Sequence, residues 1–165
     1  MVTSNSSPLI HLTRLGKIEY LFELVKKINI PEAVFDEVII QGKEKNFSEA
    51  FIIERFIREE KIEVIKVDTF DRSFYPPLGC GELEALELAR QNNELLLIDE
   101  KKARNLAQIL KIEHQTTLTT MFELLILGII NSSEYISNVK NYAEDSFISA
   151  DVIQEYIEKG EKFGR

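Results

Sequence analysis

The side chains best suited to chemistry in this sequence are oxygen donors that follow short apolar segments. Asn5 follows an opening segment that contains Val2 and Thr3, and Asp99 follows the continuous apolar run 95–98. If both segments are strands of a parallel sheet, their carboxyl ends share one edge, where such sheets carry their functional residues. We therefore expect Asn5 and Asp99 to lie at a functional edge of the sheet.

Other common catalytic groups are scarce. His11 and His114 are the only histidines and Cys80 is the only cysteine. Their spacing matches neither a Ser-His-Asp or Cys-His arrangement nor a zinc motif. Gly79 and Gly81 indicate only a tight turn, because a phosphate-binding loop needs more glycines or a Lys-Ser/Thr ending.

Predicted strands and helices alternate along the chain. We predict strands at the opening segment, at 62–67, which is rich in β-branched residues, and at 95–98, whose unbroken apolar run suits a strand covered on both faces. Helices are predicted from Ser7 and Pro8, over 18–28, from Pro31, over 46–60 with Asn46 and Glu49 in capping-box spacing, over 81–89, 103–110, 119–127 and 134–142, and around 152–157. This order predicts an α/β fold with a central parallel sheet and helices on both faces.

Composition limits the class of protein. The chain has 165 residues, with 28 Asp and Glu against 20 Lys and Arg, and a formal net charge of -8. Its length fits one domain that buries enough surface to need no disulfide or zinc. The acidic balance argues against a general nucleic-acid coat protein, whose affinity comes from many Lys and Arg contacts with phosphates. It does not exclude an acidic active site that reaches phosphates through a bound cation.

The single cysteine gives no sign of an oxidising compartment. The residues at 1–8 lack the basic and apolar regions of a signal peptide. The most apolar tract, 121–130, is about half of the roughly 20 residues needed to span a bilayer. We expect a cytoplasmic protein that does not enter a membrane.

Four blocks of residues resemble a known family. They are 4–10 (SNSSPLI), 30–38 (IPEAVFDEV), 78–86 (LGCGELEAL) and 97–104 (LIDEKKAR). In this order, and from residue 1 to about residue 130, the chain resembles a PIN domain of the prokaryotic branch close to VapC-type toxins. Residues 131–165 are expected to form a helical extension packed on the same domain.

The resemblance implies a metal-dependent ribonuclease with a cluster of carboxylates at the end of a parallel sheet. It implies catalytic and metal-binding roles for Asn5, Glu37, Glu82 and Asp99, and supporting roles for Ser6 and Thr117. Mg²⁺ and Mn²⁺ prefer such oxygen ligands. A bound cation would offset repulsion from the phosphodiester, activate a water and stabilise the leaving oxygen.

Asn5 departs from the family pattern, which has Asp at the end of the first strand. Its amide oxygen can still bind Mg²⁺ or a water that binds the metal, but the cluster loses one formal charge. A weaker attraction for the cation, with reduced or absent activity, is the expected consequence.

Each candidate also has a plain structural interpretation. Asp99 could cap the following helix, and Glu82 could be a first-turn Glu favoured by the helix dipole. Glu37 could be a solvated or bridging residue, and Asn5 could bond to its local backbone.

Lys101, Lys102 and Arg104 follow Asp99 and could contact RNA phosphates. A run of charges on a helix is more often simply a solvated face.

Three functions remain open. The first is a Mg²⁺- or Mn²⁺-dependent endoribonuclease, with a toxin role, a small antitoxin protein as partner and a homodimer as further expectations. The second is a catalytically weakened PIN-like module that binds protein or RNA. The third is a nucleotide-binding domain of the doubly wound class, against which the lack of a Gly-rich fingerprint after the first strand counts.

Overall fold

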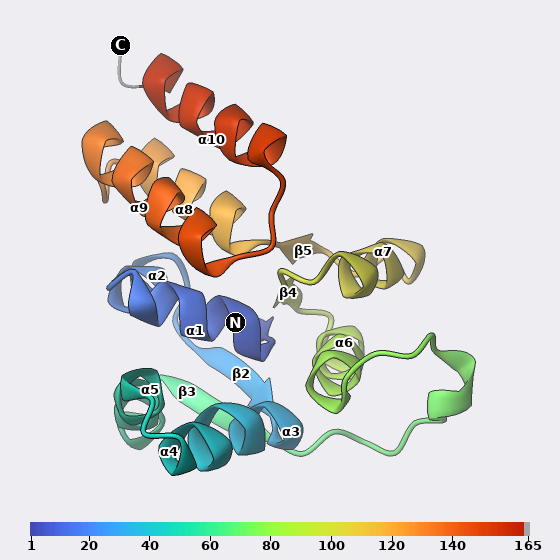
Figure 1. Ribbon diagram of the computed structural model, residues 1–165. Coiled ribbons are helices and arrows are strands. Elements are labelled where there is room, and N and C mark those ends of the chain that lie inside the picture. Colours follow the sequence, from blue (N-terminus) through green and yellow to red (C-terminus); the bar gives the residue numbers. More distant parts are fainter. Residues whose placement is uncertain (164–165) are drawn as a thin grey trace.

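The computed structural model describes residues 1–163 and is built on a parallel sheet of five strands (Figure 1). The strand order is β3-β2-β1-β4-β5, and the strands are β1 (Val2–Ser4), β2 (Ile28–Pro31), β3 (Ile62–Ile65), β4 (Leu95–Leu97) and β5 (His114–Gln115). Ser4, the last residue of β1, pairs in register with Leu97 of β4. The predicted α/β fold is confirmed, and the residues after β1 and β4 emerge side by side.

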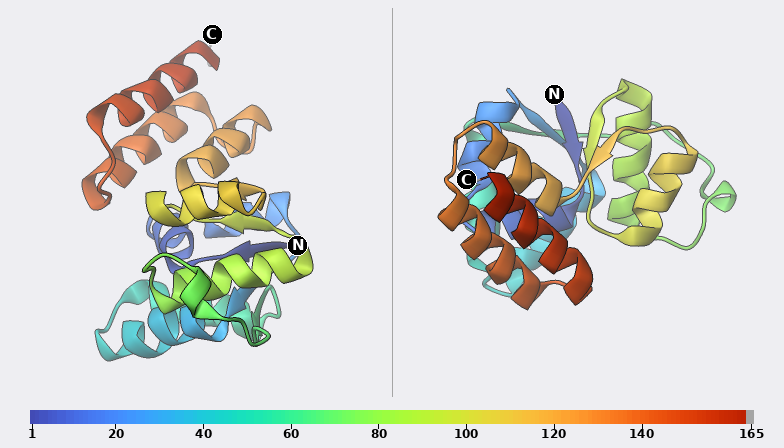
Figure 2. Two further views of the ribbon diagram at one scale, coloured as in Figure 1. Left: turned by 90° about the vertical axis from the view of Figure 1, so that its right-hand side faces the viewer. Right: turned by 90° about the horizontal axis from the view of Figure 1, so that it is seen from above.

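Helices cover both faces of this sheet (Figure 2). One face carries α1 (Ser6–Arg14), α2 (Ile18–Leu24), α5 (Ser48–Arg58) and α8 (Thr117–Ile126), and the other carries α6 (Cys80–Asn92) and α7 (Lys101–Ile109). Three short pieces run on from β2 as one helical stretch: α3 (Glu32–Phe35), a π-helical segment (Asp36–Gln41) and α4 (Gly42–Glu44). The chain then closes with α9 (Ser132–Asp145) and α10 (Ala150–Phe163).

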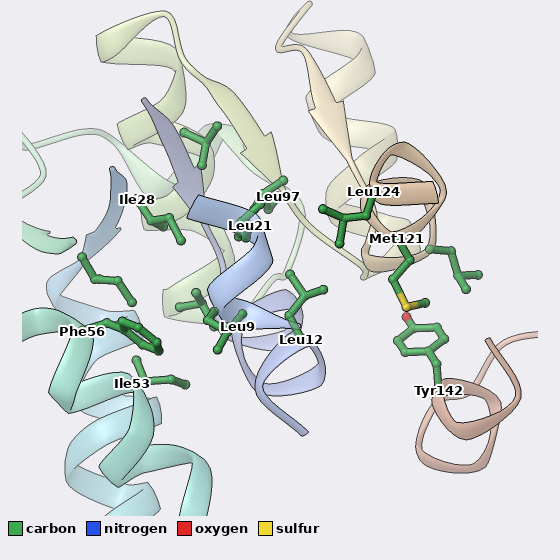
Figure 3. Close-up of a cluster of buried hydrophobic side chains, with 14 of the residues drawn as sticks. Leu9, Leu12, Leu21, Ile28, Ile53, Phe56, Leu97, Met121, Leu124 and Tyr142 are labelled. Carbon is green, nitrogen blue, oxygen red and sulfur yellow. The ribbon is translucent and has the colours of Figure 1, made fainter. Parts of the chain in front are cut away.

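Neighbouring residues of β4 enter two different cores. Leu97 belongs to the larger cluster, which also contains Leu9, Leu12 and Ile53 (Figure 3), whereas Leu96 belongs to a second cluster beneath α6 and α7. Both leucines are buried because successive side chains of a strand point to opposite faces. The strand predicted at 95–98 is therefore covered on both faces, as expected.

The segment around Ile28 is where the sequence prediction is wrong. Helix α2 ends at Leu24, and 28–31 form β2 instead of the end of one helix and the start of the next. Ile28 and Ile30 are fully buried, and β2 pairs on both sides, with β1 and β3. This tertiary pairing outweighs the helical spacing of the apolar residues, and Pro31 ends the strand.

One smaller expectation also fails, and one strand was not predicted. Asn46 adopts a left-handed conformation with φ of 57°, and α5 begins at Ser48 after Phe47, so Asn46 and Glu49 form no capping box. Glu49 instead forms an ion pair with Arg14 of α1. Strand β5 was not predicted, because two residues carry too little pattern to be recognised.

Within residues 1–163, no helix is long and apolar enough to cross a bilayer. The apolar residues Leu118, Met121 and Leu124 of α8 lie in the larger core. Met121 and Leu124 of the apolar tract 121–130 are thus buried in this domain, whereas Ile126 and Leu127 are exposed.

Helices α9 and α10 form a hairpin and pack closely against each other. The Tyr135 hydroxyl donates to the Tyr156 carbonyl at 3.1 Å, and the Ser132 hydroxyl donates to the Gly160 carbonyl at 2.6 Å. A Cβ at Gly160 would lie 2.5 Å from the Tyr135 ring. The two helices can approach this closely only because residue 160 has no side chain. The division of the chain at residue 130 stays a prediction.

We predict that Gly160→Ala lowers the free energy of unfolding by about 1–3 kcal/mol, the usual cost of overpacking a core. Alanine favours helix by about 1 kcal/mol over glycine, so any loss measured by urea unfolding reports the clash with Tyr135. Glu158→Ala, an exposed change on the same helix, serves as the control. Equal stability of Gly160→Ala and wild type would contradict the tight packing.

A buried carboxylate fastens the loop that leads into α6. Glu87 of α6 is fully buried and binds Arg90 and the Tyr75 hydroxyl. Burial by itself raises the pKa of Glu87, but the hydrogen bonds from Arg90 and Tyr75 outweigh it and leave this pKa below its usual value of 4.5. Tyr75, in the loop before α6, is thereby held against the helix.

A lowered pKa in the folded state means that Glu87 contributes stability above the pKa of its unfolded state. This contribution is lost as the pH falls through the lower folded-state value. We predict that Glu87→Gln costs about 1–3 kcal/mol near neutral pH, and that the cost shrinks as the pH falls below about 4. Urea unfolding across this range, with the exposed Glu113→Gln as control, measures it; a cost independent of pH would refute the assignment.

Candidate functional site

Asn5 lies at the carboxyl edge of the sheet, between the ends of two strands. It directly follows β1, and its backbone N–H donates to the Leu97 carbonyl of β4 at 3.0 Å. Only 5% of Asn5 is exposed. Ser6, equally buried, begins α1, so the turn from strand to helix fixes both side chains at this edge.

Glu37 reaches the same place from the other side. The Ser6 hydroxyl donates to Oε2 of Glu37 at 2.6 Å, across 31 positions of sequence. Glu37 belongs to the π-helical segment Asp36–Gln41, and π-helical turns are frequent at functional sites. The early helix therefore places the Glu37 carboxylate next to the end of β1. Its role as a metal ligand stays a prediction.

Gly81 allows these side chains to converge. A Cβ at this position would lie 3.1 Å from Oε2 of Glu37 and 3.5 Å from Oδ1 of Asn5. The backbone of α6 at Gly81 therefore lies close to the side-chain oxygens of Glu37 and Asn5. Asn5, Ser6 and Glu37 form one group, which we call the Gly81 group.

Glu82, the next residue, is turned elsewhere. Its Oε2 accepts the backbone N–H of Gly79 at 2.7 Å, which caps the start of α6. Glu82 thus has a structural role at the first turn of α6. Among the described residues, no hydrogen bond joins Glu82 to the Gly81 group. Its role as a ligand stays a prediction.

Asp99 follows β4 but does not cap the helix that comes after it. Glu100 takes that position at the start of α7. Asp99 instead accepts two hydrogen bonds from Thr117 at the start of α8: Oδ1 from the backbone N–H and Oδ2 from the hydroxyl, both at 2.7 Å. Thr117 is fully buried, so the supporting residue expected from sequence does contact the predicted acid.

Two further partners of Asp99 were not predicted from sequence. Nδ1 of His11 lies 3.0 Å from Oδ2 of Asp99, and the His11 ring packs edge-on against Tyr142 with 4.8 Å between ring centres. Burial raises the pKa of Tyr142 well above its usual value, and the charge and hydrogen bonding of Asp99 raise it further. No motif links these residues, which come from α1 and α9.

Comparison with known families identifies the fold. A family model described as a PIN domain, DUF3368, matches residues 1–162. The chain belongs to the PIN-domain family. Among solved structures, a domain of a functionally unknown protein from Methanocaldococcus jannaschii DSM 2661 is similar, with 24% identity and a TM-score of 0.48 over 70% of this chain and 89% of that one. No curated protein matches the sequence.

PIN domains have a nuclease-type fold and generally depend on divalent metal ions. In this PIN domain the donors at the carboxyl edge are carboxylate, amide and hydroxyl oxygens, which suit Mg²⁺ or Mn²⁺ in chemical type. Within residues 1–163, however, no three His, Cys, Asp or Glu side chains lie close enough together to hold a metal ion. The donors fit a hard cation that keeps several waters, and they do not form a closed carboxylate cage.

The basic residues after Asp99 have unequal exposure. Lys101 and Lys102 are exposed in the first turn of α7. Arg104 is half-buried, and its Nε is buried without a hydrogen-bond partner among the described residues. The two lysines are thus open to a phosphate, whereas Arg104 is partly enclosed beside Tyr142, whose pKa it moderates.

We predict that Gly81→Ala separates stability from metal binding in this PIN domain. The new methyl group crowds Glu37 and Asn5, so Mn²⁺ should bind roughly 10-fold more weakly, as when partners of metal ligands are disturbed. Alanine is the better helix former by about 1 kcal/mol, which opposes the cost of moving Glu37, so urea unfolding should show a change in stability of less than about 1 kcal/mol. Isothermal calorimetry with Mn²⁺ measures the first effect, with the exposed Cys80→Ala as the neighbouring control. Unchanged Mn²⁺ affinity in Gly81→Ala would show that the Gly81 group does not hold the metal.

Proposed function

We propose that this PIN domain is a Mg²⁺- or Mn²⁺-dependent endoribonuclease that acts at the carboxyl edge of its sheet. The observation that carries the proposal is the meeting of Asn5 and Glu37 at Gly81, next to the strand end that leads into Asp99. These donors come from separate elements, and burial of Asn5 and Thr117 excludes water from the back of the site. Such convergence of oxygen donors is what a phosphodiesterase requires of its protein.

When bound, the cation supplies a water of lowered pKa and neutralises charge on the phosphate. The chain's own residues hold the cation and orient the carboxylates that bind it. Glu37 and Asp99 provide the negative charge that attracts the ion, Ser6 orients Glu37, and Thr117 orients Asp99. Lys101 and Lys102 attract the RNA backbone as mobile point charges.

Asn5 makes this site weaker than one with aspartate. An amide oxygen donates electrons to a cation but carries no net charge, so the attraction for a divalent ion falls by one unit charge. Asn5 is buried, and the loss is therefore screened less than it would be at the surface. We expect millimolar Mn²⁺ to serve the enzyme better than Mg²⁺, since Mg²⁺ demands near-ideal octahedral geometry and gives up its waters reluctantly.

One observation favours a second function, a PIN-like module that binds RNA or protein without cutting. Within residues 1–163 the acids form no metal-binding group, and Glu82 and Asp99 are both engaged in hydrogen bonds. A module of this kind would use the same edge for binding. Activity restored by Asn5→Asp would point to a nuclease that has lost its first acid.

The narrower roles also belong to the proposal. A toxin of a toxin–antitoxin pair would be encoded beside a small antitoxin gene, which the neighbouring genes would reveal. A homodimer would be seen directly by light scattering of the purified protein.

We predict that wild type cuts single-stranded RNA in Mn²⁺, that Asp99→Asn lowers the rate by roughly 100-fold or more, and that Asn5→Asp raises it. Each change alters one charge at the site with almost no change of shape. Cleavage of a labelled RNA, with product lengths resolved on a gel, measures all three rates.

The exposed Asp151→Asn is the matched control for loss of a carboxylate, and it should cut as wild type does. Cleavage that persists in Asp99→Asn would indicate a contaminating nuclease or a different site. Absence of cleavage by wild type and by Asn5→Asp, with every RNA tested, would reject the enzyme.

A further inference from the structure

Asp99 lies among polar side chains from three helices. His11 comes from α1, Thr117 from α8 and Tyr142 from α9. The side chain of Asp99 is 9% exposed and that of His11 is 13% exposed, and Tyr142 is buried. The whole cluster is therefore largely buried, next to the carboxyl end of β4.

The hydrogen bonds fix the orientation of this carboxylate. An ionised carboxylate can accept about four hydrogen bonds. Oδ2 accepts from the Thr117 hydroxyl and from Nδ1 of His11, while Oδ1 accepts the Thr117 N–H. Rotation of the Asp99 carboxyl group would break all three together. Oδ1 has fewer partners here, so it keeps the capacity to meet a ligand.

Packing alone does not explain His11 and Tyr142. A polar group buried without a partner costs free energy, so a position needed only for packing is better filled by an apolar residue. Here the Tyr142 ring packs edge-on against His11, and Nδ1 of His11 lies 3.0 Å from Oδ2 of Asp99. The charge and hydrogen bonding of Asp99 also raise the pKa of the Tyr142 hydroxyl. The cost of burying them is offset by contacts with a residue that the proposed function needs.

We propose that His11 and Tyr142 are positioning residues that hold the Asp99 carboxylate ready for a divalent cation. This inference rests on the function proposed above. It also makes α9, from the segment 131–165 first regarded as an extension, a part of the active site. Residues of α1, α8 and α9 together fix the orientation of the Asp99 carboxylate.

The experiment measures Mn²⁺ binding without RNA, by calorimetry, in purified full-length variants. We expect Tyr142→Phe and His11→Ala to weaken Mn²⁺ binding about 10- to 100-fold, the effect typical of residues that orient metal ligands. His11→Asn should recover much of the affinity, because its amide nitrogen can take the place of Nδ1. Urea unfolding of each variant reports stability separately.

Tyr135→Phe is the matched control, since Tyr135 is a buried tyrosine of the same helix whose hydroxyl binds the Tyr156 carbonyl and not Asp99. It should lose stability yet keep the Mn²⁺ affinity of wild type. Equal Mn²⁺ affinity in wild type, Tyr142→Phe and His11→Ala would overturn the positioning role and leave the proposed function standing. A wild-type protein that neither binds Mn²⁺ nor cuts RNA would overturn the positioning role and the proposed function together. The two outcomes are distinguishable, because only in the second does the wild type fail to bind Mn²⁺.

Discussion

The site depends on how one nearly buried carboxylate is satisfied. Asp99 leaves the end of β4 with little exposure to water, and a charge in that position is costly unless donors surround it. Thr117 supplies two of these donors, and its backbone N–H is one that the start of α8 would otherwise leave without a partner. Asp99 and α8 therefore stabilise each other. The same carboxylate joins β4 to α1 through His11, so three elements are held in one arrangement.

A second constraint governs the other half of the site. The start of α6 lies against Glu37 and Asn5, and Gly81 is the residue that makes this approach feasible. The Ser6 hydroxyl then joins the end of β1 to the π-helical segment. The two halves differ in electrostatics, since Asp99 carries a charge and Asn5 does not. A phosphate arriving at this edge would meet fewer negative charges than in a domain with aspartate at position 5, and a cation would be held less firmly.

The fold could be predicted from sequence where pattern and burial agree. The run 95–98 is apolar throughout because both its faces are covered. Helix α1 begins at Ser6, close to the Ser7 and Pro8 from which a helix was predicted. The prediction failed at Ile28 and Ile30, where pairing with two neighbouring strands decides the conformation. Helical spacing in 18–28 could not reveal that pairing, because it lies in the tertiary structure.

The candidate site could be predicted only in part, because some of its contacts exist only in the tertiary structure. Asn5 and Asp99 could be placed at one edge because they follow strands, and Glu37 came from the family resemblance. His11 and Tyr142 could not be found, since a contact between α1 and α9 leaves no mark in the spacing of a single sequence. The turn of Glu82 toward Gly79 is equally invisible, because a first-turn glutamate suits both a cap and a ligand.

The central claim is that the carboxyl edge binds a divalent cation through Glu37 and Asp99. A crystal structure of the protein soaked in Mn²⁺, with anomalous diffraction data, tests it most directly. The account predicts a manganese peak at this edge, with an oxygen of Glu37 or Asp99 about 2 Å from the ion and waters completing its shell. A saturated crystal with no peak there, or with manganese bound only elsewhere on the surface, would contradict it.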